Sequence, residues 1–438
     1  MEYKTYKLGT CFSLIENGAI IKQRKEAKGF PITRIETLSH GKFNRDKLGH
    51  ADIFDTTPYK RYILEDKDLI MSHINSRAFL GRTVLYRKKG NEQIIHGMNV
   101  LRIKTNEQFL DPVFASYLFK TSHFKKAIDS IRKDAINQSS INIFDICNIQ
   151  ISLPSITEQR KISHALQLID KKIETNHLIN DNLEAMAKQL YDYWFVQFDF
   201  PNEEGKPYKS SGGAMVWNEK LKREIPQGWH CGTLLDIAEY TNGLACQKYR
   251  PTDNNKLPVI KIKEMHDGLS ADTEWVKANI PDDVKVFDGD VLFSWSASLE
   301  VMLWAYGNGG LNQHIFKVTS KNGYPRSFYF YQLIHYVGVF KQMAEARKTT
   351  MGHITQDHLR QSTIALPPNV DITNKLEEKL CSIFDEIVKN NQEIMALTKQ
   401  RDELLPLLMN GQATVNYHLL FSFVYYLILY IGYNEIEL

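Results

Sequence analysis

Two stretches of this chain carry the same long pattern of apolar residues, and that pattern limits the folds available to it. From Ile162 to Leu190 and from Leu376 to Leu404, apolar residues and a few asparagines recur in alternating steps of four and three, at a constant offset of 214 residues. A 4-3 alternation places all of these side chains on one seam of a helix. Each stretch therefore predicts an amphipathic helix, with about 42 Å between its first and last seam positions at 1.5 Å per residue.

The two predicted helices have equal length and equal phase, which favours packing of one on the other as an antiparallel coiled coil within the chain. The alternative is that each helix packs separately on its own domain. In the antiparallel arrangement Asn180 can face Asn390 and satisfy its amide, whereas a buried asparagine facing leucine is costly. Asn390 could instead reach water. The predicted seam residues are Ile162, Leu166, Ile169, Ile173, Asn176, Asn180, Leu183, Leu190, Leu376, Leu380, Ile383, Ile387, Asn390, Ile394, Leu397 and Leu404.

Shorter similarities in the same order indicate that the chain is built from two halves. The matched segments are 149–154 with 362–367 and 140–146 with 353–359, both at an offset of 213, and 65–72 with 288–294. Around them, short β-like runs lie between Gly, Asn and Asp turns. Examples are residues 61–64, 84–86, 100–103, 258–262 and 315–318. One helical stretch is expected in each half, at residues 111–131 and 325–345.

These patterns predict two α+β domains, each followed by one long helix. The expected boundaries are 1–155 for the first domain, 156–197 for the first helix, 198–224 for a Pro-, Gly- and Ser-rich linker, 225–367 for the second domain, 368–411 for the second helix and 412–438 for a hydrophobic tail. The tail contains Leu419 to Ile431, thirteen residues of which only Ser422 is polar. A membrane span needs about 20 residues, so we expect no membrane anchor.

Motifs for catalysis are missing from the sequence. It has no GxxxxGK[ST] phosphate loop, no glycine-rich GxGxxG turn after a strand and no HExxH metal motif. Residues 281–285 imitate a nuclease pattern, but Asp and Lys are fused there in one short segment that is expected to be a solvated turn. We therefore expect no catalytic residue, no metal ligand and no cofactor bound by this chain. Five cysteines without a CxxC pair, and an N-terminus without a signal peptide, favour a reduced, cytoplasmic protein.

Basic and polar residues cluster at equivalent places in the two halves, before the repeated segments that begin near Ile141 and Ile354. Arg and Lys can neutralise phosphates, and Asn, Gln, Ser, Thr and His can bond to phosphates or base edges. The net charge is only +3, so any basic surface must be local. The candidate DNA-binding residues are Arg132, Lys133, Asn137, Gln138, Ser139, Ser140, Gln247, Lys248, Tyr249, Lys261, Ser294, Ser296, Ser298, Asn312, Gln313, Arg347, Lys348, Thr349, Thr350 and His353.

At several of its segments the sequence resembles the specificity subunits of type I restriction-modification systems. The segment 182–215, which contains Tyr-Trp-Phe at 193–195, Phe-Asp-Phe-Pro at 198–201 and Gly-Lys-Pro-Tyr-Lys-Ser-Ser-Gly-Gly at 205–213, carries most of the resemblance. Further matching segments are Leu-Pro-Ser-Ile-Thr-Glu-Gln at 153–159, Ile-Pro-Gln-Gly-Trp at 225–229, Ser-Trp-Ser at 294–296 and Thr-Met-Gly-His-Ile-Thr at 350–355. The resemblance covers residues 1–411. The tail departs from it.

The resemblance implies two target-recognition domains in a pseudo-twofold layout, each reading half of a split site in double-stranded DNA. It implies that the two helices set the spacing between the halves. Two methyltransferase subunits would grip the helices, and restriction subunits would join through them. S-adenosylmethionine, ATP and magnesium would then bind to those partners. Two other classes remain open: a single-chain nuclease-methyltransferase, which would need a cofactor loop, and a coiled-coil protein scaffold without DNA readout.

Overall fold

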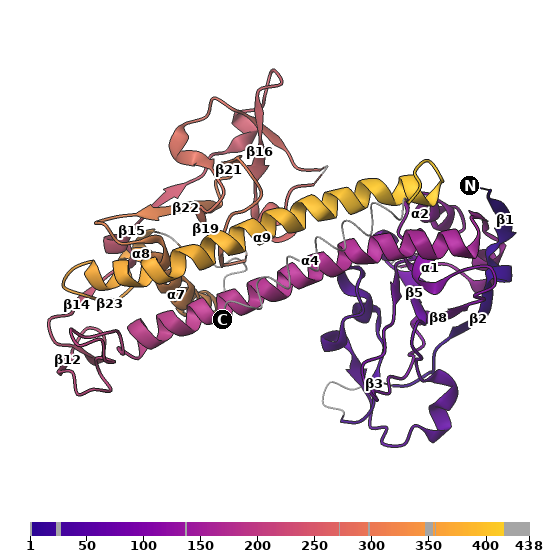
Figure 1. The fold of residues 1–438 in the computed structure, drawn as a ribbon, viewed down its shortest axis with the longest axis horizontal. Coiled ribbons are helices and arrows are strands. Elements are labelled where there is room, and N and C mark those ends of the chain that lie inside the picture. Colours follow the sequence, from indigo (N-terminus) through magenta and orange to yellow (C-terminus); the bar gives the residue numbers. More distant parts are fainter. Residues whose placement is uncertain are drawn as a thin grey trace. The chain divides into compact units, whose positions relative to one another are not determined.

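The computed structural model describes residues 2–22, 28–135, 138–270, 272–296, 298–346, 354 and 356–415 (Figure 1). Residues 416–438 of the predicted tail and the candidates Asn137, Arg347, Lys348, Thr349, Thr350 and His353 lie outside these residues. Contacts divide the chain into two units, one made of Met1–Lys171 and Lys399–Leu438 and the other of Lys172–Thr398. Within the described ranges, no helix is both long enough and apolar enough to cross a bilayer.

The first unit has at its centre a four-stranded antiparallel sheet in the order β2-β8-β5-β7. Its strands are β2 (Phe12–Asn17), β8 (Val100–Thr105), β5 (Leu69–Ser72) and β7 (Thr83–Leu85). Smaller sheets pair β1 (Lys4–Lys7) with β11 (Gln150–Leu153), β3 (Pro31–Ile32) with β4 (Gly49–His50), and β6 (Ile74–Asn75) with β10 (Ser139–Ser140) and β9 (Lys133–Asp134). Short 3-10 helices are η1 (Leu8–Cys11), η2 (Ile35–Gly41), η3 (Arg45–Lys47), η4 (Thr57–Tyr62) and η5 (Arg77–Phe79).

Helices of the first unit are short until the long one begins. They are α1 (Pro112–Leu118), α2 (Ser122–Ser130), α3 (Ile143–Asn148) and α4 (Ile156–Tyr191), of which the unit holds the part up to Lys171. The sequence predicts a single helix over 111–131, and this is wrong. Asp111 Oδ1 accepts hydrogen bonds from the backbone N–H of Val113 and of Phe114, and Thr121 Oγ1 accepts one from Phe124 N–H. Each side chain caps a helix N-terminus, so the stretch divides into two helices.

The second unit contains a sheet of the same kind, in the order β15-β22-β19-β20, and a second four-stranded sheet in the order β17-β16-β21-β18. The first of these consists of β15 (Ala238–Asn242), β22 (Ile315–Ser320), β19 (Val291–Ser294) and β20 (Glu300–Leu303). The other consists of β17 (Trp275–Lys277), β16 (Lys256–Ile260), β21 (Gly309–Leu311) and β18 (Lys285–Val286). Two-stranded sheets join β12 (Met215–Asn218) to β13 (Arg223–Pro226) and β14 (His230–Gly232) to β23 (Ile364–Leu366).

Helices of the second unit include the long C-terminal helix. They are the π-helix η6 (Asp192–Val196), α5 (Leu234–Ile237), η7 (Cys246–Lys248), α6 (Ile262–Asp267), η8 (Asp282–Val284), α7 (Arg326–Ala346), α8 (Gln356–Gln361) and α9 (Asp371–Met409). Of α9, the residues up to Thr398 belong to this unit and the rest to the first. The helix expected at 325–345 is confirmed by α7.

Two other local predictions are wrong. Residues 61–64 are predicted as a strand, but η4 ends at Tyr62 and only Ile63 forms an isolated bridge. The linker 198–224 is predicted as a loop, yet it contains β12 and leads into β13 as a hairpin. Phe198 and Phe200 from this segment are buried in the core of the second unit. The density of proline and glycine in this segment predicted a loop. The two phenylalanines, spaced two residues apart, are nevertheless core residues.

The strand order confirms that the chain is built from two halves. In each main sheet, the strand that corresponds to the sequence repeat, β5 or β19, lies between two antiparallel neighbours. The pair β1–β11, just before α4, corresponds to β14–β23, just before α9. Strand order, pairing direction and place relative to a long helix therefore agree between the halves.

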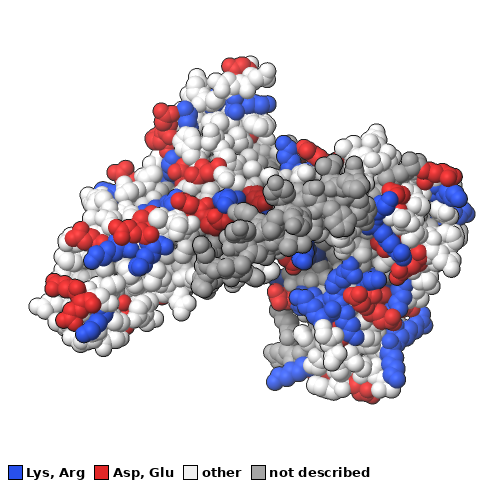
Figure 2. All heavy atoms as spheres, in the orientation of Figure 1, with Lys and Arg blue, Asp and Glu red and all other residues white. Residues whose placement is uncertain are grey.

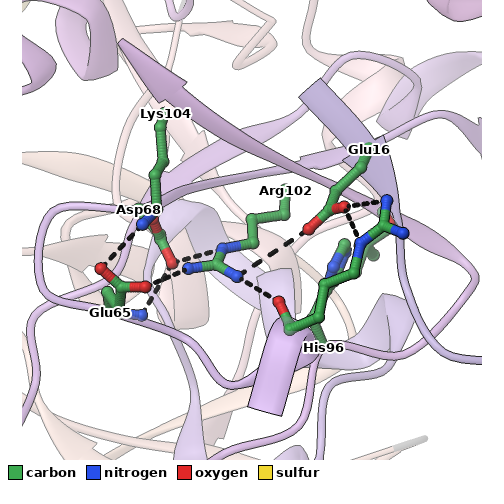
Figure 3. A network of polar contacts seen from close by, with 8 residues as sticks. Glu16, Glu65, Asp68, His96, Arg102 and Lys104 are labelled. Carbon is green, nitrogen blue, oxygen red and sulfur yellow. Dashed lines mark hydrogen bonds and ion pairs between the residues drawn. The ribbon is translucent and has the colours of Figure 1, made fainter. Parts of the chain in front are cut away.

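A buried ionic network in the first unit supports this sheet (Figure 3). Arg102 on β8 is 2% exposed, and its Nε lies 2.7 Å from Asp68 Oδ2, whose side chain is 1% exposed. The guanidinium also donates to the Arg61 carbonyl at 2.9 Å and to Glu65 at 3.2 Å. In the second unit, Lys317 on β22 lies 2.8 Å from Asp290, which precedes β19 as Asp68 precedes β5. The Asp–cation pair is therefore present in both halves.

The two long helices run antiparallel and contact each other through polar side chains. In the second unit, Asn390 Nδ2 donates to Asn180 Oδ1 at 2.9 Å, so the predicted pair is present. Asn180 Nδ2 donates to Asn391 Oδ1 at 2.8 Å, and Asn176 Nδ2 to Glu393 Oε2 at 2.7 Å. In the first unit, Arg401 donates to Asp170 at 2.9 Å.

Apolar seam residues serve both the helix pair and the domain cores. Every predicted seam residue is buried or partly buried. Leu376 and Leu380 belong to the core of the second unit, and Ile162 and Leu166 pack in the core of the first together with Leu408. The two arrangements that the sequence left open are therefore combined, since the helices contact each other and also pack on their own units.

Replacing Asn390 by Leu should lower the free energy of unfolding by about 1–3 kcal/mol. The substitution removes the donor to Asn180 Oδ1 and leaves a buried acceptor without its partner. Chemical denaturation measures the loss. The double variant Asn180→Leu/Asn390→Leu replaces both partners by apolar groups and should recover most of it. A single variant as stable as the parent would contradict a structural role for the pair.

Candidate nucleic-acid interface

Most predicted residues of the second half meet at one end of its sheets. In the main sheet Ser294 pairs with Ile315, and Asn242 pairs with Phe316, so the ends of β15 and β19 lie beside the start of β22. In the other sheet Ile260 pairs with Leu311, so Lys261 and Asn312 follow neighbouring strand ends. The residues gathered here are Gln247, Lys248, Lys261, Ser294, Ser296, Ser298, Asn312 and Gln313.

An aromatic and amide cluster lies at this end. Trp295 Nε1 donates to Asn242 Oδ1 at 3.1 Å, and its ring lies 5.5 Å from the His314 ring, centroid to centroid. Gln313 Nε2 lies 3.3 Å from His314 Nε2. His314 Nδ1 is buried and has no hydrogen-bond partner among the described residues. Amide and imidazole groups of this kind can read base edges.

Several of the predicted residues are buried or already bonded to other groups of the chain. Ser294 is fully buried, its hydroxyl donates to the Ser298 carbonyl, and it accepts from Glu300 N–H at 3.2 Å. It therefore shapes the turn after β19. Ser296 and Asn312 are also buried. Lys261 Nζ forms an ion pair with Glu274 at 2.5 Å, so its charge is largely compensated.

Ser298 takes part in a hydrogen-bonded chain beside this turn. Its Oγ lies 3.0 Å from His266 Nε2, and His266 Nδ1 lies 3.1 Å from Glu300 Oε2. These contacts tie α6 to the turn between β19 and β20. Ser298 therefore helps to fix the position of the exposed edge on which Gln313 and Lys248 lie.

Next to η7 lies a basic and aromatic surface of which the sequence analysis predicted only Tyr249. Lys256 Nζ lies 4.5 Å above the Trp275 ring, and Lys277 Nζ lies 5.3 Å from the centre of the Tyr249 ring. Trp275 is 44% exposed. Aromatic faces with cations beside them are suited to stacking on bases and neutralising phosphates. The alternation Trp275-Val276-Lys277 in a strand was the signal that could have revealed it.

In the first unit, the predicted cluster forms the small sheet β6-β10-β9. Arg132 forms ion pairs with Asp129 and Asp134, the latter at 2.6 Å. The hydrogen bonds from Arg132 and from Ser139 hold the pKa of Asp134 below its usual value. Ser139 is buried, so neither it nor Arg132 is available for a phosphate in this conformation. Lys133, whose side chain is 67% exposed, and Gln138 remain accessible, and Ser140 is half-buried.

One backbone hydrogen bond is repeated at both candidate clusters. Ile141 N–H donates to the His73 carbonyl at 3.0 Å, and Ile354 N–H donates to the Trp295 carbonyl at 3.0 Å. Ile141 and Ile354 are equivalent in the sequence repeat, and His73 and Trp295 each follow the repeated serine of β5 or β19. Ile141 and its counterpart Ile354 are thus held at equivalent points beside the main sheets.

Beside the first cluster lies a hollow of about 580 Å³ whose charged lining residues are mostly basic. Arg77, Arg82, Lys120 and Lys125 line it together with one acid, Asp129. On the face drawn in Figure 2, lysine and arginine gather over the part of this unit that Figure 1 draws below α4. A local positive surface of this kind attracts the phosphate backbone of DNA.

The described residues do not assemble a catalytic metal site. No three His, Cys, Asp or Glu side chains gather there as metal ligands. The nuclease-like stretch forms η8, in which Asp282 is 91% exposed at its side chain and pairs with Lys285 at 2.7 Å. Exposed carboxylates on one short turn do not converge on a common ion. The expected solvated turn is thus confirmed.

Known proteins share this architecture. Residues 1–185 and 226–402 match the family described as "Type I restriction modification DNA specificity domain". The chain is 28% identical over 437 residues, 94% of either protein, to a Methanocaldococcus jannaschii chain named as a candidate specificity subunit of the type I restriction enzyme MjaX. It is 23% identical over 481 residues to the HindI specificity subunit of Haemophilus influenzae, covering 94% of this chain and 99% of that one.

A solved structure supports the fold. The crystal structure of the type I restriction-modification S subunit from M. genitalium matches with a TM-score of 0.56 at 14% sequence identity, over 93% of this chain and 96% of that one. At this identity the likeness concerns the fold alone. It agrees with the duplicated α+β arrangement described above.

Proposed function

Because this chain belongs to the type I restriction-modification DNA specificity family, it recognises a DNA target, and we propose that each half of the chain reads one half of a bipartite target in double-stranded DNA. The repeated architecture carries the proposal. Two sheets have the same strand order, and beside each of them the chain makes the same backbone hydrogen bond, from Ile141 or Ile354 to the residue after the repeated serine. Two similar DNA-binding domains in one chain are suited to a DNA target that has two separated parts.

As a specificity subunit, the chain is a non-catalytic component of a restriction-modification complex. Nothing supports a single-chain nuclease-methyltransferase or a scaffold that does not read DNA. In the proposed complex, S-adenosylmethionine, ATP and magnesium bind to partner subunits. Its five cysteines are free thiols, which suits work on DNA in the cytoplasm.

We also propose roles for the long helices. Their pairing sets the number of unread base pairs between the half-sites. Two methyltransferase subunits bind along them, and restriction subunits join through those. Apolar side chains on the outer face of α4, such as Leu178 (57% exposed) and Met186 (59% exposed), support the proposal, since large exposed apolar residues on a helix are suited to a protein partner.

Replacing Gln313 by Ala should relax one half of the methylated target and leave the other half unchanged. A lost side-chain contact to a base costs about 1–3 kcal/mol of discrimination at one position. Genome-wide mapping of methylated adenines in cells that carry the variant measures both halves at once. Lys379→Ala, an exposed change on α9, is the control and should leave the motif intact. Changes in both halves would contradict one half-site per unit.

A further inference from the structure

A second hollow, of about 490 Å³, lies in the second unit and differs in character from the basic one. It forms between the segment after η6 and the start of α9. Three exposed carboxylates line it and are called its rim here: Glu203, Glu204 and Asp371. Its aromatic and proline lining residues are Phe200, Pro201, Tyr208, Trp229, Pro367 and Pro368. The only basic residue that lines it is Lys375.

The aromatic side chains that line the hollow are held in place by stacking on one another. The Tyr208 and Phe200 rings stack at 4.8 Å, and Phe200 stacks on Trp229 at 5.3 Å, each pair with planes 18° apart. Tyr208 N–H donates to the Phe200 carbonyl at 2.9 Å, which closes the loop between them. Fixed aromatic walls lower the ordering cost of binding.

Carboxylates give the rim a negative charge. Glu204 pairs with Lys206 at 2.9 Å, while Glu203 is exposed and has no ion-pair partner among the described residues. Asp371 lies exposed in the first turn of α9. Carboxylates beside aromatic rings attract an ammonium or guanidinium group, and they repel the phosphates of DNA. The chemistry therefore indicates a cationic protein ligand.

We infer that this hollow receives a lysine or arginine side chain from a methyltransferase partner subunit. The inference rests on the proposed function, because it takes from there that such a subunit binds. The hollow is lined by the start of α9 and by the segment that follows α4 and η6 in the chain, so a partner bound along the long helices is near it. The carboxylates attract the positive charge of this side chain, and the stacked aromatic rings contact it.

The test is charge reversal on the rim, measured on the full chain with its methyltransferase subunit. The variant Glu203→Lys/Glu204→Lys should weaken the complex about 10- to 100-fold, in line with removing hydrogen-bonded charge pairs at an interface. Binding of the parent should weaken as salt rises, and the variant should lose most of that dependence. The matched control, Asp282→Lys/Asp283→Lys, changes the net charge equally at a remote turn and should bind like the parent.

The outcomes separate this inference from the function on which it rests. If the parent chain forms no complex with the methyltransferase subunit, the proposed partner is wrong. If parent and rim variant bind equally well, or the control weakens binding as much as the rim variant, the hollow is not the site. A rim variant that changes only self-association, detected by light scattering without the partner, would assign the hollow to a second copy and overturn the inference.

Discussion

Inserting one heptad into each long helix should lengthen the unread part of the DNA target by about three base pairs. Seven residues add about 10.5 Å of helix, and DNA rises about 3.4 Å per base pair. The Asn180–Asn390 bond sets a register in which Ile173 faces Leu397. Insertions after Ile173 and before Leu397 therefore keep each seam residue opposite its partner on both sides of the insertion.

Methylated adenines mapped across the genome report the result. The two half-site sequences should persist, because the insertions change no residue of either sheet. An insertion in one helix alone is the control, and it should abolish modification, because it shifts one seam against the other and separates Asn180 from Asn390. Altered half-sites with the original spacing would contradict the proposal that the helices set the number of unread base pairs.

Arg102→Met should destabilise the first unit by about 3–5 kcal/mol, the usual cost of removing one partner from a buried ion pair. The guanidinium contacts Asp68, Glu65 and the Arg61 carbonyl (Figure 3). Without it, Asp68 stays almost fully buried with an uncompensated charge. Calorimetry of the unit's thermal transition should show a fall of roughly 10 °C, since a unit of this size shifts by about 2–4 °C per kcal/mol.

The second half provides a matched control. Lys317→Met removes the equivalent cation, but Asp290 has a side chain 23% exposed, and water can solvate its charge. The loss there should be smaller, about 1–2 kcal/mol. A second comparison is Asp68→Leu/Arg102→Met, which removes both charges and should recover much of the stability. Equal losses of stability from Arg102→Met and Lys317→Met would show that burial of the partner aspartate does not determine the size of the loss.

Long-range periodicity made the helices and the repeat predictable. A seam of 29 residues from Ile162 to Leu190 cannot arise from a strand or loop, and its copy fixes which asparagines meet. Local sequence patterns gave wrong secondary-structure predictions where two patterns overlapped in one segment. Thr121 caps a new helix inside an apparently continuous one, and the prolines around Phe200 hid a segment that is buried in a core.

Site residues were harder to predict, because residue type does not reveal what a side chain already contacts. Arg132 looks like a phosphate ligand until the structure places it between two aspartates. Ser294 looks like a base-reading hydroxyl until it is found fully buried. Trp275 and Lys256 lie on paired strands, and only the register Pro258–Trp275 brings them together. The contacts of a side chain and the register of two paired strands are set by the tertiary structure, so local sequence patterns do not reveal them.

The repeated bond made by Ile141 and Ile354 has a consequence for how targets change over generations. Both bonds join backbone atoms, so neither bond depends on the side chains of the residues that make it. Exposed side chains beside the first bond, such as Lys133 and Gln138, can therefore be substituted while the main sheet, its buried ion pair and the helices stay unchanged. If each half reads one half-site, as proposed, such substitutions would change one part of the DNA target at a time and leave folding and assembly unchanged.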